Sequence, residues 1–393
     1  MPELTPLDHV PGFTEPIRTA LRPYWITSAE EFASLARLGN PEHTTAMNAL
    51  AIAMRIDRTT IDTLYKACLE ASPQRAREYS ASTELIVGDG LLLDESDAPS
   101  GALSFALPAG LPESHTLPIA HLPPVLQQGE RNTCVAFTMV AMYQIVSQDA
   151  TDLSEQFLFW ACKQVDKRPN DPSGTTPQAA IDALRHYGVC LETDWPYEPG
   201  ARAGDITRGQ PSRESIAAAT RRKVGGGGKL ESTSSAAVIT ALAEGLPVLL
   251  GLDYYPFWTQ SGQALRGGRV RLPLPGETRR GGHAVCAIGY QKDESAPGGG
   301  YIIFRNSWGE DFGAENAYAC GYGYVPYEVV DATNRFAYTI DQVIAPTSLG
   351  APGASEQANT GDLIAEARAV FTRAQGEMNQ LRALLDRLAR GER

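Results

Sequence analysis

The sequence predicts an α+β protein in which a helical lobe precedes a strand-rich lobe, flanked by a small N-terminal helical module and a C-terminal amphipathic helix. Apolar residues at helical spacing fill two segments, CVAFTMVAMYQIVSQ from residue 134 and PQAAIDALRHYG from residue 177. Short apolar runs bounded by Gly, Pro or Asn follow them: LPVLLGL from 246, HAVCAIGY from 283 and GYIIFRNSW from 300. Helices first and strands later favour two segregated lobes.

Length and composition indicate a globular protein with one main domain and appendages. The chain has 393 residues, of which 43% are hydrophobic and 20% are charged. A chain of this length can bury a substantial core, and this balance argues against disorder. The formal net charge of -12 provides no basic footprint for nucleic acid, so no nucleic-acid partner is predicted.

We expect a cytoplasmic protein. The first residues, MPELTPLDHVPGF, lack a basic start followed by an apolar run, so no signal peptide is predicted. No stretch approaches the roughly 18 apolar residues of a membrane span. The six cysteines form no CxxC pair, which favours a reducing setting and argues against a zinc site. Delivery elsewhere by a route without a signal peptide is left open.

Residues 1–75 are predicted to form the small helical module. Ser28 with Glu31 matches a capping box, Pro41 suits the start of a second helix, and Thr59 or Thr60 is expected to cap a third. Residues 76–119 show little periodicity and are interpreted as a linker or as a segment that occludes the cleft of the main domain, residues 120–346. The glycine run 225–228 is expected to be a loop.

The tail is predicted to be a separate element. Residues 347–360 have a linker-like composition. Residues 361–393 carry apolar residues at alternating steps of three and four, which indicates an amphipathic helix with a broad apolar face. Docking on the main domain, self-association and binding of a partner protein are all compatible with this pattern.

Cys134 is the strongest candidate for a nucleophile among the six cysteines. It follows the polar stretch QQGERNT directly and opens an apolar helix. The positive end of a helix dipole stabilises a thiolate, and a neighbouring imidazole stabilises it further. The chain must therefore supply a suitable histidine.

His283 suits this role best among the six histidines. It follows Gly281 and Gly282, opens a predicted strand, and lies 149 residues after Cys134, which agrees with a spacing of about 130 to 150 in one class of cysteine enzymes. Asn306, at the end of the next strand, is predicted to orient the imidazole. Trp308 is expected to cover their hydrogen bond, and Gln128 to supply an oxyanion donor beside the Cys134 amide.

These segments resemble those of the papain-like cysteine peptidase family, C1-type, in a form that looks bacterial and intracellular. QGERNTCVAF is similar to the family's QGxCGSCWAF, HAVCAIGY to HAVLVVGY, and RNSWGEDFGAENAYACGYG to KNSWGxxWGxxGY. The order Gln, Cys, His, Asn is also the family's order. The resemblance covers roughly residues 120 to 345.

The resemblance implies a papain-like two-lobe fold with a cleft between Cys134 on one lobe and His283 and Asn306 on the other. It also implies substrate-binding roles for Gly174 on the cleft wall, and for Ala284 with residues 249–252 at an apolar pocket. Trp308 is also predicted to contribute to substrate binding. Arg131 stands where the family has a structural cysteine, so the family's disulfide near the active site cannot form. Asn132, Thr133 and Val135 depart from the family pattern as well.

The predicted activity is thiol-dependent hydrolysis of peptide bonds through an acyl-enzyme on Cys134, without a metal or organic cofactor. A protein or peptide is the expected substrate. Two alternatives are retained: acyl transfer to an amine, as in a peptide ligase or cyclase, and a catalytically inactive papain-fold scaffold. The N-terminal module is interpreted as an interaction unit for a protein partner, in preference to a self-inhibiting role, and the C-terminal helix is a second candidate for partner binding.

Overall fold

The computed structural model describes residues 4–35, 41–81, 84–88, 90–92, 110–169, 171–199 and 209–344, with the backbone alone for 41–47. The predicted linker 347–360 and the predicted amphipathic helix 361–393 lie outside these residues. Among the described helices, none combines the length and the apolar character that crossing a bilayer requires.

The N-terminal module is helical and has its own hydrophobic core. Its elements are η1 (Leu7–His9), α1 (Glu15–Leu21), η2 (Arg22–Tyr24), α2 (Ala29–Leu35), α3 (Pro41–Met54), α4 (Arg58–Ala71) and α5 (Pro73–Ser80). The core gathers Leu21, Phe32, Leu50, Ile61 and Leu64. Because Ala76 on α5 belongs to the same core, the module continues past the predicted boundary at residue 75.

Two of the three predicted helix starts in this module agree with the structure. Ser28 and Glu31 form a reciprocal capping box, in which each side chain accepts the other residue's backbone N–H at 3.2 Å. Helix α3 begins at Pro41. The predicted cap at Thr59 or Thr60 is wrong, because Asp57 is the N-cap of α4 and its Oδ1 accepts the backbone N–H of Thr60 at 2.7 Å. A carboxylate just before the first helical residue accepts this bond, and Thr60 lies inside the first turn.

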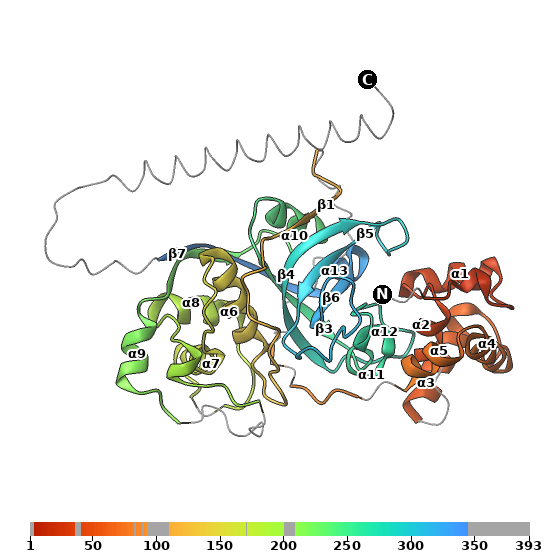
Figure 1. Ribbon diagram of the computed structural model, residues 1–393, viewed down its shortest axis with the longest axis horizontal. Coiled ribbons are helices and arrows are strands. Elements are labelled where there is room, and N and C mark those ends of the chain that lie inside the picture. The colour runs from red at the N-terminus through yellow and green to blue at the C-terminus, as the bar shows by residue number, and fades with distance from the viewer. Residues whose placement is uncertain are drawn as a thin grey trace, which may run out of the picture. The chain divides into compact units, whose positions relative to one another are not determined.

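The helical lobe of the main domain is built on three helices. They are α6 (Cys134–Ser147), α7 (Glu155–Val165) and α8 (Pro177–His186), followed by η3 (Glu192–Asp194) and α9 (Arg213–Ala219). Helix α6 is buried at 12 consecutive positions, from Cys134 to Ile145, and packs between the other helices and the sheet (Figure 1). It is therefore the central helix of the domain, and its first residue is Cys134.

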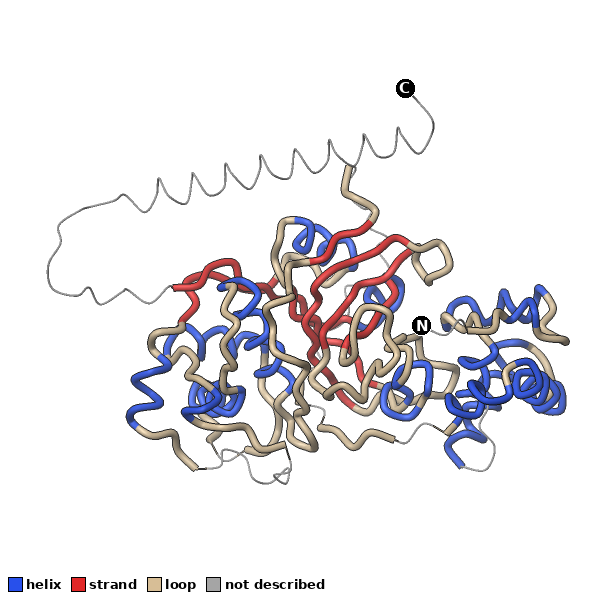
Figure 2. The backbone as a smooth tube through the Cα atoms, viewed as in Figure 1, coloured by secondary structure: helices blue, strands red, loops and turns tan. Residues whose placement is uncertain are grey.

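The strand-rich lobe contains one seven-stranded antiparallel sheet in the order β2-β7-β3-β4-β5-β6, with β1 also paired to β4. The strands are β1 (Ser114–Thr116), β2 (Lys223–Lys229), β3 (Val248–Tyr254), β4 (Gly281–Lys292), β5 (Gly300–Arg305), β6 (Tyr322–Pro326) and β7 (Asn334–Ile344). Helices α10 (Ser235–Ala243), α11 (Phe257–Gln260), α12 (Gly262–Leu265) and α13 (Tyr327–Thr333) complete the lobe. Figure 2 shows the strands gathered beside the helices α6 to α8. The three predicted strands, β3, β4 and β5, are confirmed.

The glycine run 225–228 is not a loop, contrary to the expectation from its composition. It lies within β2, which pairs with β7 through two register irregularities. Gly227 has φ +133°, a conformation that glycine adopts readily and that suits a bulge. Backbone pairing with β7 therefore overrides the local preference of glycine for loops.

Candidate active site

Cys134 is the first residue of α6, and its side chain is fully buried. The N-cap residue Thr133 makes no side-chain capping bond. Its hydroxyl is instead hydrogen-bonded to the hydroxyl of Tyr197, at 2.7 Å between the oxygens. Because Cys134 is the first residue of the helix, its thiol lies at the positive end of the helix dipole, where a thiolate is stabilised.

His283, the third residue of β4, is oriented by Asn306. The distance from His283 Nε2 to Asn306 Oδ1 is 2.8 Å. Because Asn306 Oδ1 also accepts the backbone N–H of Ser307 at 2.8 Å, the atom facing the ring is the oxygen, and His283 Nε2 must carry the shared proton. The neutral ring then presents Nδ1 as an acceptor, and this atom is buried with no hydrogen-bond partner among the described residues.

Aromatic side chains enclose the imidazole. Trp308 stacks on His283 with ring centroids 4.4 Å apart, and Trp258 meets it edge-on at 6.0 Å. Burial lowers the pKa of His283 to about 4, and the hydrogen bond to Asn306 opposes this shift only in part. In this arrangement the imidazole is neutral at physiological pH, and Trp308 stacks on the ring that is hydrogen-bonded to Asn306.

Gln128 is fully buried beside the start of α6. Its side-chain Nε2 donates to the carbonyl oxygens of Arg131, at 2.8 Å, and Gly88, at 3.0 Å. Its Oε1 accepts the Ser307 hydroxyl at 2.6 Å, so the amide orientation is fixed. The carbonyl of Gly88 therefore occupies the N–H group that would stabilise an oxyanion.

The loop before Cys134 is bound to the residues that follow Asn306. The Gln128 backbone N–H donates to the Ser307 carbonyl at 2.8 Å, and Gln127 forms a β-bridge with Trp308. The fold therefore brings Gln128 close to Asn306 and, through Asn306, to His283. Gln128 lies six residues before Cys134, the first residue of α6.

A stretch of the N-terminal region, residues 84–92 without residue 89, crosses this site. The Gly88 N–H donates to the Gly129 carbonyl at 3.0 Å, and the Leu91 N–H donates to the carbonyl of Gly282 at 3.3 Å. Further on, the Thr175 N–H donates to the Gly90 carbonyl at 3.1 Å, and the Leu92 N–H donates to the Thr175 carbonyl at 3.2 Å. We call residues 84–88 and 90–92 the cleft segment, because they join the loop before Cys134 to the residue before His283.

Of the predicted substrate-binding positions, Gly174 and the zone 249–252 lie against the cleft segment. A side chain at Gly174 would overlap the backbone of Gly90. Ala284 is buried on β4 and pairs with Gly251 on β3. A methyl group at Gly251 would come within 2.9 Å of the Leu91 side chain, so Leu91 fills the zone that the sequence assigned to an apolar pocket. Trp308 is fully buried against His283.

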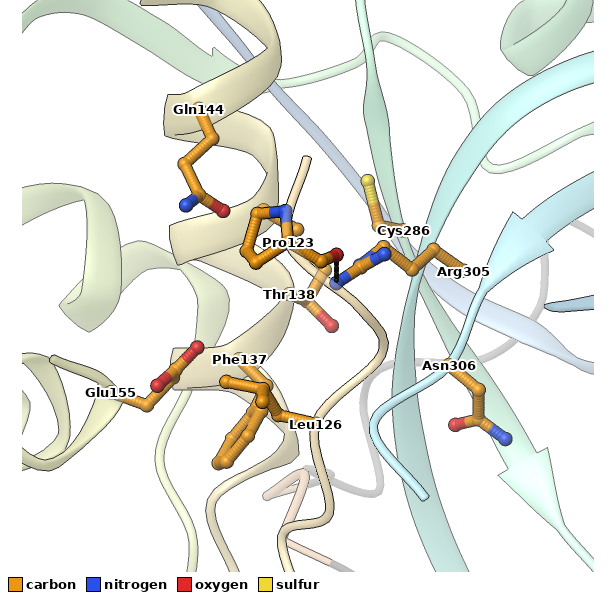
Figure 3. Close-up of a pocket in the computed structure, with 10 residues that line it drawn as sticks. Pro123, Leu126, Phe137, Thr138, Gln144, Glu155, Cys286, Arg305 and Asn306 are labelled. Carbon is orange, nitrogen blue, oxygen red and sulfur yellow. Dashed lines mark hydrogen bonds between the residues drawn. The ribbon is translucent and has the colours of Figure 1, made fainter. Parts of the chain in front are cut away.

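A small cavity lies behind the site, between α6 and the strands (Figure 3). Asn306, Arg305 and Cys286 line it from the strand side, and Phe137, Thr138 and Glu155 are among the residues that line it from the helical lobe. None of the residues that hydrogen-bond to the cleft segment lines this cavity. It is therefore an inter-lobe cavity and not the cleft.

Several contributing residues could not be recognised from sequence patterns. Ser307 fixes Gln128, Tyr197 bonds the loop before Cys134, and Gly282 and Thr175 bind the cleft segment. Ser307 could have been suspected because it follows Asn306 directly. Among the described residues, no group of three or more His, Cys, Asp or Glu side chains could hold a metal ion.

This architecture defines a class: two-lobe α+β proteins in which a cysteine opens the central helix and a histidine lies on a facing strand. The family profile described as papain family cysteine protease matches residues 114–324. The chain belongs to this family.

The similar proteins include enzymes from plants and bacteria. Papain from Carica papaya is 29% identical over 203 residues, which cover 50% of this chain and 50% of papain. An uncharacterized peptidase C1-like protein of Acanthamoeba polyphaga mimivirus is 25% identical over 52% of this chain and 66% of its own length. Xylellain, a cysteine protease from Xylella fastidiosa, has a solved structure with 25% identity and a TM-score of 0.53, covering 67% of this chain and 99% of xylellain. The chain thus spans between half and two thirds of the curated relatives named here.

Proposed function

We propose that this chain is a thiol-dependent peptidase in a latent form, with its own cleft segment in the substrate site. The observation that supports the chemistry best is the bond between His283 Nε2 and Asn306 Oδ1, which leaves Nδ1 as the proton acceptor. Cys134, His283, Asn306 and Gln128 keep the roles that the sequence predicts. No observation favours acyl transfer to an amine or an inactive scaffold over hydrolysis.

The reaction proceeds through a thioester. Cys134 Sγ attacks the substrate carbonyl carbon while His283 Nδ1 receives the thiol proton. The carbonyl oxygen becomes an oxyanion, which is stabilised by the Gln128 side-chain N–H. His283 then gives its proton to the leaving amine as the C–N bond breaks. Water adds to the thioester with His283 as base, and the acid product leaves as the thiol forms again.

Latency is supported by the groups that the cleft segment occupies. The Gly88 carbonyl accepts a hydrogen bond from the Gln128 side-chain N–H, and Leu91 lies beside Gly251 in the predicted apolar zone. Cys134 and His283 are fully buried. The bridge between Leu91 and Thr175 is parallel. A substrate must displace these contacts before its carbonyl can reach Cys134.

The two glycines of the cleft segment allow its close approach. A methyl group at Gly90 would overlap the backbone of Asn132, and one at Gly88 would overlap the carbonyl of Arg131. Gly90→Ala should therefore expel the segment and raise hydrolysis of a peptide substrate by roughly tenfold to a hundredfold, since overpacking costs about 1–3 kcal/mol. Leu91→Asp, which places a carboxylate in an apolar zone away from Asn132, should have the same effect.

The experiment compares full-length variants by peptide hydrolysis and by labelling with a thiol-directed epoxide. Gly228→Ala is the matched control, because a methyl group there meets no atom within 4 Å. Cys134→Ala should abolish both signals in every background, with a loss of at least ~10³-fold. Hydrolysis that survives Cys134→Ala would refute the proposed activity. If the unaltered chain hydrolyses peptides and both Gly90→Ala and Leu91→Asp do so at the same rate, latency is refuted but the peptidase activity is not.

We also propose a cytoplasmic setting and a role for residues 361–393 in partner binding. The cytoplasmic setting is supported by Arg131 at a position where the family carries a cysteine. Fractionation of cells that produce the full chain tests it, and recovery outside the cytoplasm would contradict it.

The N-terminal module already packs on the main domain through Gln263 and Arg269, which supports an internal role for the module. For residues 361–393 the proposal rests on the apolar stripe in their sequence, and their deletion should abolish association without changing hydrolysis.

A further inference from the structure

The loop between Gln128 and Thr133, here called the oxyanion loop, is held at both ends by one hydroxyl group. The Tyr197 hydroxyl donates to the Gln128 carbonyl at 2.7 Å and lies 2.7 Å from the Thr133 hydroxyl oxygen. A phenol has a single proton to donate, so the Thr133 hydroxyl must be the donor to Tyr197. Both ends of the loop, one of them next to Cys134, therefore depend on the position of Tyr197.

The middle of the oxyanion loop is anchored by Arg131, whose guanidinium is buried. Arg131 is 2% exposed and donates to Gln156 Oε1 on α7 at 2.7 Å. Its guanidinium carbon lies 4.6 Å from the centre of the Tyr197 ring and 5.9 Å from that of Phe159. Stacking of a planar guanidinium on an aromatic face contributes most where water is excluded.

Tyr197 is itself fixed from other sides. Its backbone N–H donates to Glu192 at 2.7 Å, and the Phe137 ring on α6 meets its ring edge-on at 4.8 Å. Burial raises the pKa of Tyr197 to about 12, so the phenol keeps its proton for the Gln128 carbonyl. The buried Arg131 and the half-buried Tyr197 thus form one unit that connects the oxyanion loop to α6 and α7.

We propose that Arg131 and Tyr197 are positioning residues, which clamp the oxyanion loop without a covalent bond at the place where the family has a structural cysteine. This inference rests on the proposed peptidase function. The clamp holds the backbone from which the Gln128 side chain extends, while Ser307 fixes the amide orientation, and the clamp contains no sulfur. A reductant that keeps Cys134 reduced therefore leaves the geometry of the oxyanion loop unchanged.

The test separates positioning of the oxyanion donor from reactivity of the thiol. The variants are made in full-length protein that carries Gly90→Ala. If the unaltered chain is already active, it serves as the parent instead. Tyr197→Phe removes the hydroxyl and keeps the ring under Arg131, while Arg131→Met removes the cation. Peptide hydrolysis requires oxyanion stabilisation, whereas alkylation of Cys134 by iodoacetamide does not. Tyr187→Phe, in the same lobe and packed against Trp160, is the control for loss of a phenol.

Tyr197→Phe and Arg131→Met should each lower kcat by between about tenfold and a hundredfold, the range for a catalytic group misplaced by about 1 Å. KM and the iodoacetamide rate should change by less than about twofold, because substrate binding and the thiol are unaltered. Arg131→Lys should recover only part of kcat, because an ammonium cannot stack as a plane. Unchanged kcat in both variants, or an equal fall in alkylation and hydrolysis, would overturn the clamp. An inactive parent would refute the proposed function instead.

Discussion

At the scale of single residues, the site combines a thiol that a helix dipole stabilises as an anion with an imidazole that burial keeps neutral. Asn306 decides which nitrogen of His283 carries the proton, because its oxygen is already fixed by the Ser307 N–H. The remaining nitrogen is buried, and the cleft segment is hydrogen-bonded to Gly282, the residue before His283. Under the proposed function, the resting chain has the tautomer that catalysis requires, and the cleft segment must move before a substrate can bind.

The lowered pKa of His283 predicts a specific loss of stability in acid. Between about pH 6.5 and about pH 4 the unfolded chain binds a proton at this residue and the folded chain does not. The free energy of unfolding should therefore fall as the pH falls through this window, by up to about 3 kcal/mol for this residue.

Chemical denaturation of the unaltered chain and of His283→Gln at several pH values measures this contribution as a difference. Burial raises the pKa of Glu192 to about 7, which acts in the opposite direction between about pH 4.5 and 7, so the curve of the unaltered chain alone is insufficient. Parallel pH curves for the two proteins would contradict the assignment.

At the scale of elements, the N-terminal module is attached to the main domain by ion pairs around α12. Glu315 accepts two hydrogen bonds from Arg75 on α5, at 2.5 and 3.1 Å, and pairs with Arg266. Arg269 pairs with Glu31 on α2 and covers the Trp25 ring, with 3.9 Å from its guanidinium carbon to the ring centre. These contacts hold the module beside α12, and the cleft segment follows the module directly.

Glu315→Gln should loosen this attachment. The Glu315 side chain is about one-fifth exposed, so loss of its ion pairs should cost about 1 kcal/mol. The form in which the cleft segment has left the site should then be populated about fivefold more. Initial rates of peptide hydrolysis at low and high salt would measure the effect, with Glu328→Gln on α13 as the control. Equal rates for both variants would show that these ion pairs do not contribute to latency.

At the scale of the whole molecule, the chain has two separate hydrophobic cores, and each includes a residue from outside its own stretch of sequence. Leu274 of the main domain belongs to the core of the module, and Leu91 of the cleft segment belongs to the core of the main domain. The N-terminal part of the protein, up to Leu92, is thus bound at two places, and the proposed latency depends on both contacts together.

Residues 110–346 alone should hydrolyse peptides faster than the full chain, by at least about tenfold if 1.4 kcal/mol or more of binding is lost. Added as a separate polypeptide, residues 1–92 should restore inhibition only at high concentration, because tethering provides an effective concentration of the order of mM. Dose–response curves with the unaltered and Leu91→Asp forms of 1–92 would measure this. Equal rates for the full chain and the truncated form would instead favour a targeting role for the module.

Much of the fold was predictable because its signals are local. The apolar runs that became β3, β4 and β5 and the apolar helix that starts at Cys134 are short-range patterns. The cap of α4 and the glycine-rich strand β2 were mispredicted for physical reasons. Asp57 accepted the bond expected for a threonine, and pairing with β7 outweighed the loop preference of glycine.

The sequence by itself determined the reactive groups and their order along the chain, since a cysteine at the start of an apolar helix and a histidine at the start of a buried strand are defined by their neighbours. Only the tertiary structure decided which residues of the stretch 76–119 lie beside the site, namely the cleft segment, and that Tyr197 and Arg131 contact the oxyanion loop. Those contacts join positions up to about 190 residues apart, such as Leu91 and Gly282. They depend on hydrogen bonds and packing between distant segments, which leave no periodic pattern in the sequence.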